Sequence, residues 1–411
     1  MTRVVIAAIA VAVTLAGCSA IGNLSGPADD SSGGPTVAEP TLTSPPATAT
    51  SLPPVDAGAA FGPDGTHYPT DTPDIRAGLG DYHVVDVEAS ATAIRDALDA
   101  LTPEQVDAGT VIRVAPGDIP NMRALDGYSN PRQQKVLITA RDGFESVTGT
   151  LGWRFTDVRG IAVTRVDLAE LDVKGATHCS FGWLRLSNHY LGAAAANGVA
   201  IDDVQFVEVV EPDAVLKSSD SAQVKAYPPN SLQNVTIDGS DLAPSFYQDG
   251  SYGPGNPRPH TDTLQIEGDG ITGGITISDT AVFASNNSAI IIGGVTGITF
   301  EHALVVAGGV QQQRYPFPAG AAGARGARQG PGSVGAVQGK GGGSISAIDS
   351  TFIGSLRPVW ATVTNSTTNV PSAVKRDDRF TLDESLSSWT EQDLDAVSVP
   401  PTADYLRTIW D

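Results

Sequence analysis

The feature that most constrains the fold is a short template that recurs along the middle of the chain. It consists of a small or turn residue, alternating β-branched positions, polar residues and a closing apolar residue. Each copy therefore has the pattern of a short strand, a bend and the start of another strand. Two copies, from Gly274 and Gly297, begin 23 residues apart, and the other intervals are longer. The copies are NVTIDGSDL from Asn234, GITISDTAV from Gly274, GITFEHALV from Gly297, SISAIDSTF from Ser344, GIAVTRVDL from Gly160 and GVAIDDVQF from Gly198.

A period of this kind, built from strands with no helical spacing between them, predicts a solenoid. In each copy the alternation puts Ile, Val or Phe on one face and Thr, Ser or Asp on the other. A β-sandwich also contains many short strands, but it has no reason to repeat one strand-bend-strand template. The chain also has almost no Asn-Gly or Asp-Gly hairpin turns between adjacent alternating runs. The pattern favours an all-β fold, a right-handed parallel β-helix, over the sandwich.

The N-terminus has the pattern of an export signal. Arg3 precedes an apolar run from Val4 to Gly17 that is too short to span a bilayer comfortably, and the run ends in LAGC at Cys18. This order resembles the lipobox of bacterial lipoproteins. The resemblance implies that residues 1 to 18 are a lipoprotein signal peptide and lipobox, and that Cys18 is lipidated. The protein would then be exported and anchored to the outer face of the cell membrane, in the cell envelope. An ordinary secretory signal or a short membrane anchor is the alternative, and either would also export the protein.

Composition divides the rest of the chain. Residues 19 to 56 are mostly Ser, Thr, Pro, Gly, Ala and Asp, which predicts a disordered tether. About 350 residues remain, enough for one large domain. We expect the β-helix domain over residues 57 to 383. A C-terminal cap over residues 384 to 411 would fold across the far end of the stack. That stretch carries large apolar residues at uneven spacing, namely Trp389, Leu394, Tyr405, Leu406 and Trp410.

The start of the domain predicts a helix ahead of the first strands. In ASATAIRDALDALTPEQVDAGTVIRVAPGDI, the side chains of Ile94, Ala97, Leu98 and Leu101 share one helical face, and a strand from Val111 to Val114 and a Pro-Gly turn follow. Here the chain resembles the pectate-lyase-like superfamily of right-handed parallel β-helices, over roughly residues 84 to 383. The resemblance implies an N-terminal capping helix, which would cover the core and the unpaired strand edge at that end.

Charge and cysteine content exclude several classes of protein. The formal net charge of −21 disfavours nucleic acid as a partner and repels polyanionic sugars at long range. A uronate polymer would need a local basic cleft or a bound cation. If Cys18 is lipidated, Cys179 has no intrachain partner, and we expect it to be a small buried core residue. The chain has no phosphate-binding GxxxxGK motif, no HExxH and no CxxC.

A polar cluster, RPHTDTLQI, stands where a long insertion from Leu242 to Pro259 returns to the repeat. It resembles the Asn-Thr-Asp segment of the polygalacturonase family, with His260-Thr261-Asp262 at the corresponding place. The expected catalytic residues are Asp262, His260 and Arg258. That family has an Asp-Asp pair in the next coil, where this chain has Asn286 and Asn287. Amides do not act as general acids, and inverting hydrolysis needs two carboxyl groups about 6.5 to 9.5 Å apart. The second carboxyl would come from Asp241, Asp249, Glu267 or Asp279.

A lyase would need a base and a cation that neutralises a uronate carboxyl. The available side chains are Lys217, Lys225, Arg258, His260 and Arg314, and His189-Tyr190 is a further acid/base pair. Superfamily lyases commonly use calcium, so Ca²⁺ stays open as a cofactor. Strict alternation puts Asp262 on the inward side with Leu264 and Ile266, where it would only cap a turn. The residues expected to bind substrate are Asn286, Asn287, Gln265, Tyr247, Tyr252 and Arg314.

Two functions follow from these patterns. The first is a lipid-anchored extracytoplasmic β-helix enzyme that acts on a polysaccharide, by glycosidic hydrolysis or by β-elimination. The second is a non-catalytic β-helix that binds cell-wall glycans or serves as an adhesin-like spacer. The long loops and the His-Thr-Asp cluster favour the enzyme, whereas Asn286 and Asn287 favour the binding protein. In both cases the partners are a glycan and, through the lipid anchor, the membrane.

Overall fold

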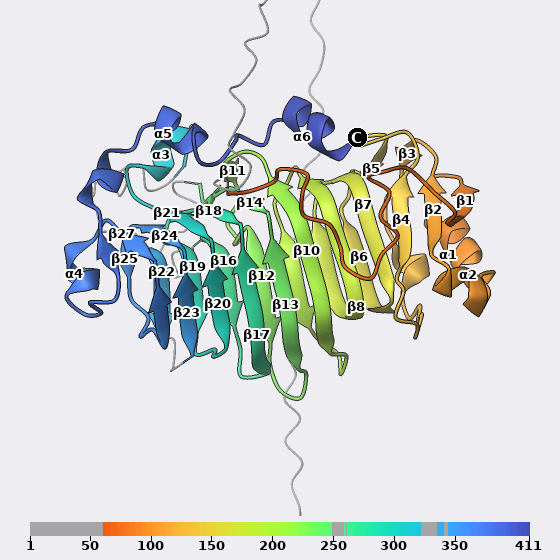
Figure 1. Ribbon diagram of the computed structural model, residues 1–411, viewed down its shortest axis with the longest axis horizontal. Coiled ribbons are helices and arrows are strands. Elements are labelled where there is room, and N and C mark those ends of the chain that lie inside the picture. Colours follow the sequence, from red (N-terminus) through yellow and green to blue (C-terminus); the bar gives the residue numbers. More distant parts are fainter. Residues whose placement is uncertain (1–60, 249–258, 260, 322–334, 341–343) are drawn as a thin grey trace, which may run out of the picture. The chain divides into compact units, whose positions relative to one another are not determined.

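The computed structural model describes residues 61–248, 259, 261–321, 335–340 and 344–411 (Figure 1). The chain divides into two compact units, Met1–Pro53 and Pro54–Asp411, and every described residue belongs to the second. This unit is mostly β. It contains a 26-stranded sheet and a two-stranded sheet of β11 (Val215–Leu216) and β15 (Ser245–Phe246). The named strands of the large sheet pair in parallel, each with a strand one coil earlier or later, as expected for a solenoid.

The strands form three ladders, and the long strands bend from one ladder into the next. The first ladder contains β1 (His83–Val87), β2 (Thr110–Val114), β4 (Val136–Ala140), β7 (Ile161–Leu168), β8 (Leu171–Leu186), β10 (Ile201–Glu211), β13 (Leu232–Asp238), β17 (Ile271–Ser278), β20 (Ile298–Glu301), β23 (Ile345–Ile348) and β26 (Thr362–Thr364). The second contains β3 (Gly117–Asp118), β5 (Val147–Gly149), the ends of β7, β8 and β10, β14 (Asp241–Leu242), β18 (Ala281–Phe283), β21 (Leu304–Val306), β24 (Thr351–Ile353), β27 (Thr367–Thr368) and β28 (Thr381–Leu382). The third contains β6 (Trp153–Arg159), the start of β8, β9 (Leu191–Ala195), β12 (Ala222–Ala226), β16 (Asp262–Glu267), β19 (Ser288–Gly293), β22 (Gly335–Lys340) and β25 (Ser355–Leu356).

The core is built from columns of inward side chains, one from each coil. In the first ladder the Phe181 and Phe206 rings stack with centroids 5.9 Å apart. Each buried side chain of this size stabilises the fold by about 1.5 to 3 kcal/mol. Cys179 is buried in this core, as expected, and burial raises the pKa of its thiol to about 11. The central column comprises Ile112, Ile138, Val163, Phe181, Phe206, Ile237, Ile277, Phe300 and Ala347.

The bend between the first and second ladders falls on one residue in each of eight coils. That residue has a left-handed backbone, with φ of 63° at Arg165 and 48° at both Asp279 and His302. The bend residues are Arg165, Trp183, Glu208, Gly239, Asp279, His302, Asp349 and Asn365. Five of them occupy the sixth position of the template. The copy GVAIDDVQF is an exception. Val204 pairs with Val235, so its sixth residue, Asp203, matches Asn234 and lies at the preceding bend of the coil.

Short helices lie near both ends of the stack (Figure 1). Helices α1 (Ala91–Asp99) and α2 (Pro103–Asp107) and the 3-10 turn η1 (Arg123–Leu125) lie at the β1 and β2 end, where α1 buries Ile94 and Leu98. At the opposite end α4 (Pro371–Val374) lies beside Trp360 and Phe380, whose rings pack 5.3 Å apart. Within the described ranges, no helix has the length and apolar character needed to cross a membrane.

Two segments, which we call the N-terminal and C-terminal arms, run along the side of the stack. The N-terminal arm, residues 61 to 82, covers the outer face of the first ladder, where Ile75 packs on Val111 and Leu137. The C-terminal arm, residues 397 to 411, contains α6 (Ala403–Trp410) and returns to the early coils, where Asp411 accepts a hydrogen bond from Phe144 N. In the chain the arm comes after η3 (Glu384–Ser388) and α5 (Glu391–Asp395), and α5 lies beside α3 (Gln311–Arg314), as Figure 1 shows. Residues 384 to 411 were expected to fold across the far end of the stack, but the last part of this stretch, residues 397 to 411, lies along the side of the stack.

His67 fastens the N-terminal arm to the bend column. Its Nδ1 lies 3.2 Å from Glu208 Oε1, and its Nε2 lies 3.4 Å from Asp279 Oδ2. Gly239 makes room for the ring, since a Cβ there would lie 2.4 Å from His67 Nδ1. Burial opposes the charge, but the hydrogen bonds to Asp279, Asp64 and Glu208 outweigh it and raise the pKa of His67 to about 12. Glu208 also accepts a hydrogen bond from Trp410 Nε1 at 2.7 Å, so both arms meet on one carboxylate.

Gly239→Ala is expected to displace the His67 ring and weaken the N-terminal arm. Gly198→Ala is the matched control, because Gly198 also has positive φ but a Cβ added there would meet nothing within 4 Å. The control should cost only the backbone strain, about 1 to 2 kcal/mol. Gly239→Ala should cost about 3 kcal/mol more, because the buried charges lose their partner. Urea unfolding followed by circular dichroism measures both, and equal losses would refute this role of His67.

The pH dependence of stability should report the charge on His67. Because the folded-state pKa is raised from 6.5 to about 12, the stabilisation is fully present below about pH 6.5 and is lost as the pH rises toward about 12. Imidazole chemical shifts should show His67 still protonated at pH 10. The free energy of unfolding of the wild type should fall between pH 7 and pH 10 more steeply than that of His67→Asn. Identical slopes would contradict the assignment.

Candidate functional site

Asp262 lies inside the stack, on the side that strict alternation predicts. It begins β16 and is fully buried, as are Leu264 and Ile266. Its Oδ1 accepts a hydrogen bond from Asn287 Nδ2 at 2.8 Å and another from Ser288 Oγ. These hydrogen bonds connect the first residue of β16 to the next coil, so they contribute to the stability of the fold. A catalytic role for Asp262 stays a prediction.

Three other predicted residues meet around the same turn. Asn286 Oδ1 accepts hydrogen bonds from Tyr247 N at 2.9 Å and from Thr261 Oγ1 at 3.1 Å. Asn287 contacts Asp262, as described above. The Tyr247 side chain is only 1% exposed, so its ring does not present a face to a ligand. Four predicted residues lie outside the described part of the chain, namely Arg258, Tyr252, His260 and Cys18.

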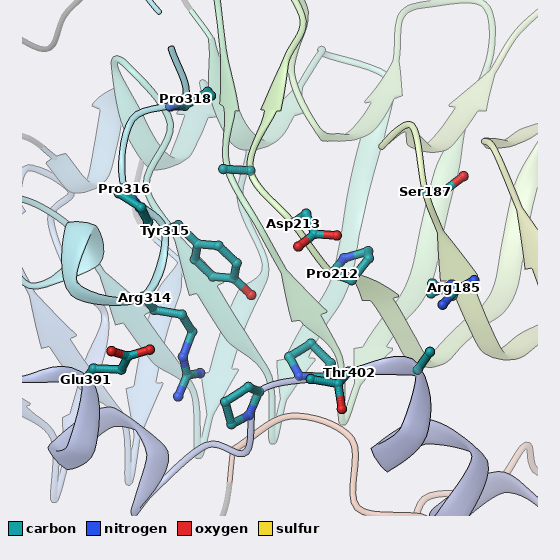
Figure 2. Close-up of a pocket in the computed structure, with 14 residues that line it drawn as sticks. Arg185, Ser187, Pro212, Asp213, Arg314, Tyr315, Pro316, Pro318, Glu391 and Thr402 are labelled. Carbon is teal, nitrogen blue, oxygen red and sulfur yellow. The ribbon is translucent and has the colours of Figure 1, made fainter. Parts of the chain in front are cut away.

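Gln265 and Arg314 lie elsewhere. Gln265 is on the outer face of the third ladder, where its Nε2 donates to Glu267 Oε2 at 2.8 Å. Arg314 ends α3, and its guanidinium donates to Asp395 Oδ1 at 2.8 Å and to the Ser398 carbonyl. The Arg314 side chain is 5% exposed and lines the pocket drawn in Figure 2. Among the described binding residues, Asn286, Asn287 and Tyr247 therefore meet at one turn, whereas Gln265 and Arg314 have their contacts elsewhere.

The outer face of the third ladder carries a cleft of about 600 Å³ over β6, β8 and the start of β9, which we call the Tyr190 cleft. Its apolar part is formed by Leu151, which is 77% exposed, together with Trp153 and Tyr190. Its charged part comes from Arg123, Arg154, Glu170, Asp172, Lys174 and Lys217. The coils that supply these residues follow one another in the stack, so the parallel register assembles the cleft.

The Tyr190 cleft is locally basic. Four cations and two carboxylates line it, which leaves a formal charge of +2 on a protein whose net charge is −21. Arg154 Nη2 lies 2.8 Å and Lys174 Nζ lies 3.1 Å from the Asp172 carboxylate. Lys217 Nζ donates to Glu170 Oε1 at 2.7 Å and to the His189 carbonyl at 2.6 Å. Both carboxylates are therefore held by cations of the cleft.

Tyr190 has a strained backbone at the centre of the cleft. Its φ is 144°, and that of the preceding His189 is 46°. Such conformations cost about 1 to 3 kcal/mol each and concentrate at functional sites. Gly192 allows the ring to lie on strand β9, since a Cβ there would lie 2.7 Å from Tyr190 Cε1. Burial and the nearby Asp172 and Glu170 raise the pKa of Tyr190 to about 12, so the phenol is neutral and can donate a hydrogen bond.

His189, proposed from sequence as the acid/base partner of Tyr190, faces a different environment. Its side chain is fully buried, with Nδ1 3.2 Å from Ser221 Oγ and 3.5 Å from Ser245 Oγ. Burial lowers the pKa of His189 to about 3, so the imidazole is neutral. Tyr190, in contrast, lines the cleft. The two side chains therefore do not act at the same point.

Polar residues continue from the Tyr190 cleft along the third ladder. Gln223 pairs with Gln265, and the next coils bring Ile291 and Gln338 into the same column. Successive residues of such a column are separated by about 4.8 Å. The neighbouring outward column contains Ala194, Lys225, Glu267 and Gly293. Amide and charged side chains, at Gln223, Gln265, Lys225 and Glu267, thus continue from the cleft along the stack.

Sequence reasoning named Tyr190 and Lys217 but missed Arg154, Asp172 and Gly192. The one local signal was the segment NHYLG, in which an aromatic residue stands two positions before a glycine in the middle of a repeat. Comparison of the chain with protein-family models, with curated proteins and with solved structures finds no match. The functional proposal therefore depends on the geometry of the cleft itself.

Asp262→Asn is expected to behave as a structural substitution. The neutral amide replaces a carboxylate oxygen that accepts from both Asn287 and Ser288, so the free energy of unfolding should fall by about 1 to 3 kcal/mol. Asp269→Asn, an exposed carboxylate just after β16, is the control and should change little. Binding of a polysaccharide should stay within about twofold for both variants. An Asp262→Asn protein that is fully stable but inactive would instead support a catalytic role for Asp262.

Proposed function

We propose that this protein is a right-handed parallel β-helix of the pectate-lyase-like type, exported and lipid-anchored through Cys18, that binds a polysaccharide along the outer face of its third ladder. The parallel ladders and the repeated bend support the β-helix, and α1, which packs on β1 and β2, is suited to cap the first coil. The lipobox pattern supports export and anchoring. A lipid anchor would hold the binding face outside the cell, where such polymers occur.

The local charge of the Tyr190 cleft is the observation that carries this function. An acidic protein repels a polyuronate unless it offers a local basic cleft, and the four cations around Tyr190 meet that requirement. Arg154 and Lys174 can bind carboxylate and hydroxyl oxygens, while Leu151 and the Tyr190 ring offer apolar surface to the sugar ring. We therefore propose a uronate-containing glycan as the ligand. The polar column through Gln223 and Gln265 would bind its further sugar units.

β-Elimination at the same cleft is the second candidate, favoured by the strained backbone of Tyr190. Elimination requires a base that removes the proton next to the uronate carboxyl, a cation against that carboxyl, and an acid that protonates the leaving oxygen. Arg154 is suited to hold the carboxyl and the neutral Tyr190 phenol to protonate the leaving oxygen, while Lys217, which also lines the cleft, is the candidate base. Hydrolysis has less support. It needs a protonated carboxyl facing the glycosidic oxygen, whereas Asp172 and Glu170 are held by cations.

Arg154→Met and Tyr190→Ala should each weaken binding of oligogalacturonate about tenfold, because each removes a cation or an apolar face from the cleft. Binding is measured by calorimetry at low salt, with a neutral glucan beside the uronate. Lys375→Met, which removes an exposed cation near α4, is the matched control and should not change affinity. Mass spectrometry of the products, with and without calcium, detects turnover. Unsaturated ends would establish elimination, and intact polymer that is still bound would leave recognition as the function.

Failure to bind any uronate, or an equal loss in Lys375→Met, would overturn the proposal. Preferential binding of the neutral glucan would indicate that the ligand is a neutral polysaccharide. Oligosaccharides with added water would establish hydrolysis and require a second carboxyl, for which Glu170 and Asp172 are the first variants to make.

A further inference from the structure

A second pocket, of about 770 Å³, lies beside the second ladder (Figure 2). One wall is the turn after β10 at Pro212 and Asp213, another follows α3, and a third is the beginning of the C-terminal arm. It shares no lining residue with the Tyr190 cleft. The C-terminal arm therefore helps to form a separate pocket, which the proposed glycan function does not use.

Prolines form much of the wall of this pocket. Proline has a fixed φ and no backbone N–H, so it presents apolar ring surface and a carbonyl oxygen but no donor. Tyr315 adds an aromatic side chain between the prolines (Figure 2). Five prolines line the pocket, namely Pro212, Pro316, Pro318, Pro400 and Pro401.

Most side-chain donors that line the pocket already have partners within the protein, although the buried Nε of Arg314 has none among the described residues. Arg314 donates to Asp395 and Ser398, and Arg185 donates to Asp167 at 2.6 Å. The Tyr315 hydroxyl donates to Asp241 Oδ1 at 3.2 Å. Ser187 Oγ donates to the Leu168 carbonyl. A ligand of this pocket would therefore find few donors available to it.

Two carboxylates remain available. Asp213 and Glu391 line the pocket and are exposed, and neither has an ion pair with the described residues. Figure 2 shows them on different walls, with Asp213 after β10 and Glu391 at the start of α5. Carboxylates, proline carbonyls and apolar rings together match a ligand that donates hydrogen bonds, carries positive charge and has an aliphatic body. The negative charge of the whole protein also attracts such a ligand.

We propose that this pocket binds a primary ammonium group on an aliphatic chain, with Asp213 and Glu391 as its anionic contacts and the prolines and Tyr315 as its apolar walls. A free diamine and the side chain of a lysine in a peptide share this chemistry. The other end of the aliphatic chain differs between the two. It is a second ammonium group in the diamine and a peptide backbone in the lysine, so an experiment can distinguish them.

The test uses the full-length protein in detergent and 1,5-diaminopentane as the probe, with calorimetry as the measurement. Saturable binding is expected, and 1,5-pentanediol, which has the same chain without charge, should not bind. Asp213→Asn and Glu391→Gln should each weaken binding about tenfold, and the double variant should abolish it. Asp378→Asn removes an exposed carboxylate near α4 and should leave affinity unchanged.

A second arm compares the tripeptide Gly-Lys-Gly with the diamine, and tighter binding of the peptide would identify a lysine side chain as the natural ligand. Equal losses in Asp378→Asn and in the pocket variants would show only general attraction to an acidic protein and would overturn the proposal. Absence of saturable binding to both probes would also overturn it. Unfolding midpoints of the variants, measured in parallel, ensure that a loss of affinity is not a loss of fold.

Discussion

The structure depends on one backbone constraint, the left-handed residue at the same corner of successive coils. A non-glycine residue in that conformation costs about 1 to 2 kcal/mol, yet Arg165, Asp279 and His302 all adopt it. The ladder hydrogen bonds on both sides of the corner offset this cost. Because the corners stack, their side chains form an outward row, and His67 binds to that row at Glu208 and Asp279. The same constraint therefore shapes the coil and attaches the N-terminal arm.

Sequence could predict what is local. The template predicted parallel coils because the alternation of apolar residues and the turn residue are both properties of nine consecutive positions. The same alternation predicted that Asp262 faces inward with Leu264. The template fails at GVAIDDVQF. Each coil there has two bends whose neighbouring sequences are similar, and the template aligned this copy with the wrong bend. The strand register, in which Val204 pairs with Val235, shows which bend the copy contains.

Sequence could not predict what arises between coils. The Tyr190 cleft joins Arg154, Asp172 and Gly192, which meet because the coils between them have particular lengths. No motif holds these residues together, and the need for glycine at 192 comes from the Tyr190 ring above it. The arms are a stronger case. The contacts of Glu208 with His67 and Trp410 join residues 141 and 202 positions apart, which no periodic pattern contains.

The meeting of both arms on Glu208 has a consequence for how the protein reaches its native state. A stack of repeats with contacts only between neighbours can form coil by coil as the chain is made. Trp410 follows every coil in sequence, so its bond to Glu208 closes only after all of them have been synthesised. Until then Oε2 of Glu208 lacks the hydrogen bond that Trp410 donates to it. The early coils are therefore expected to stay susceptible to proteases and to exchange of their amide protons until synthesis has passed Trp410.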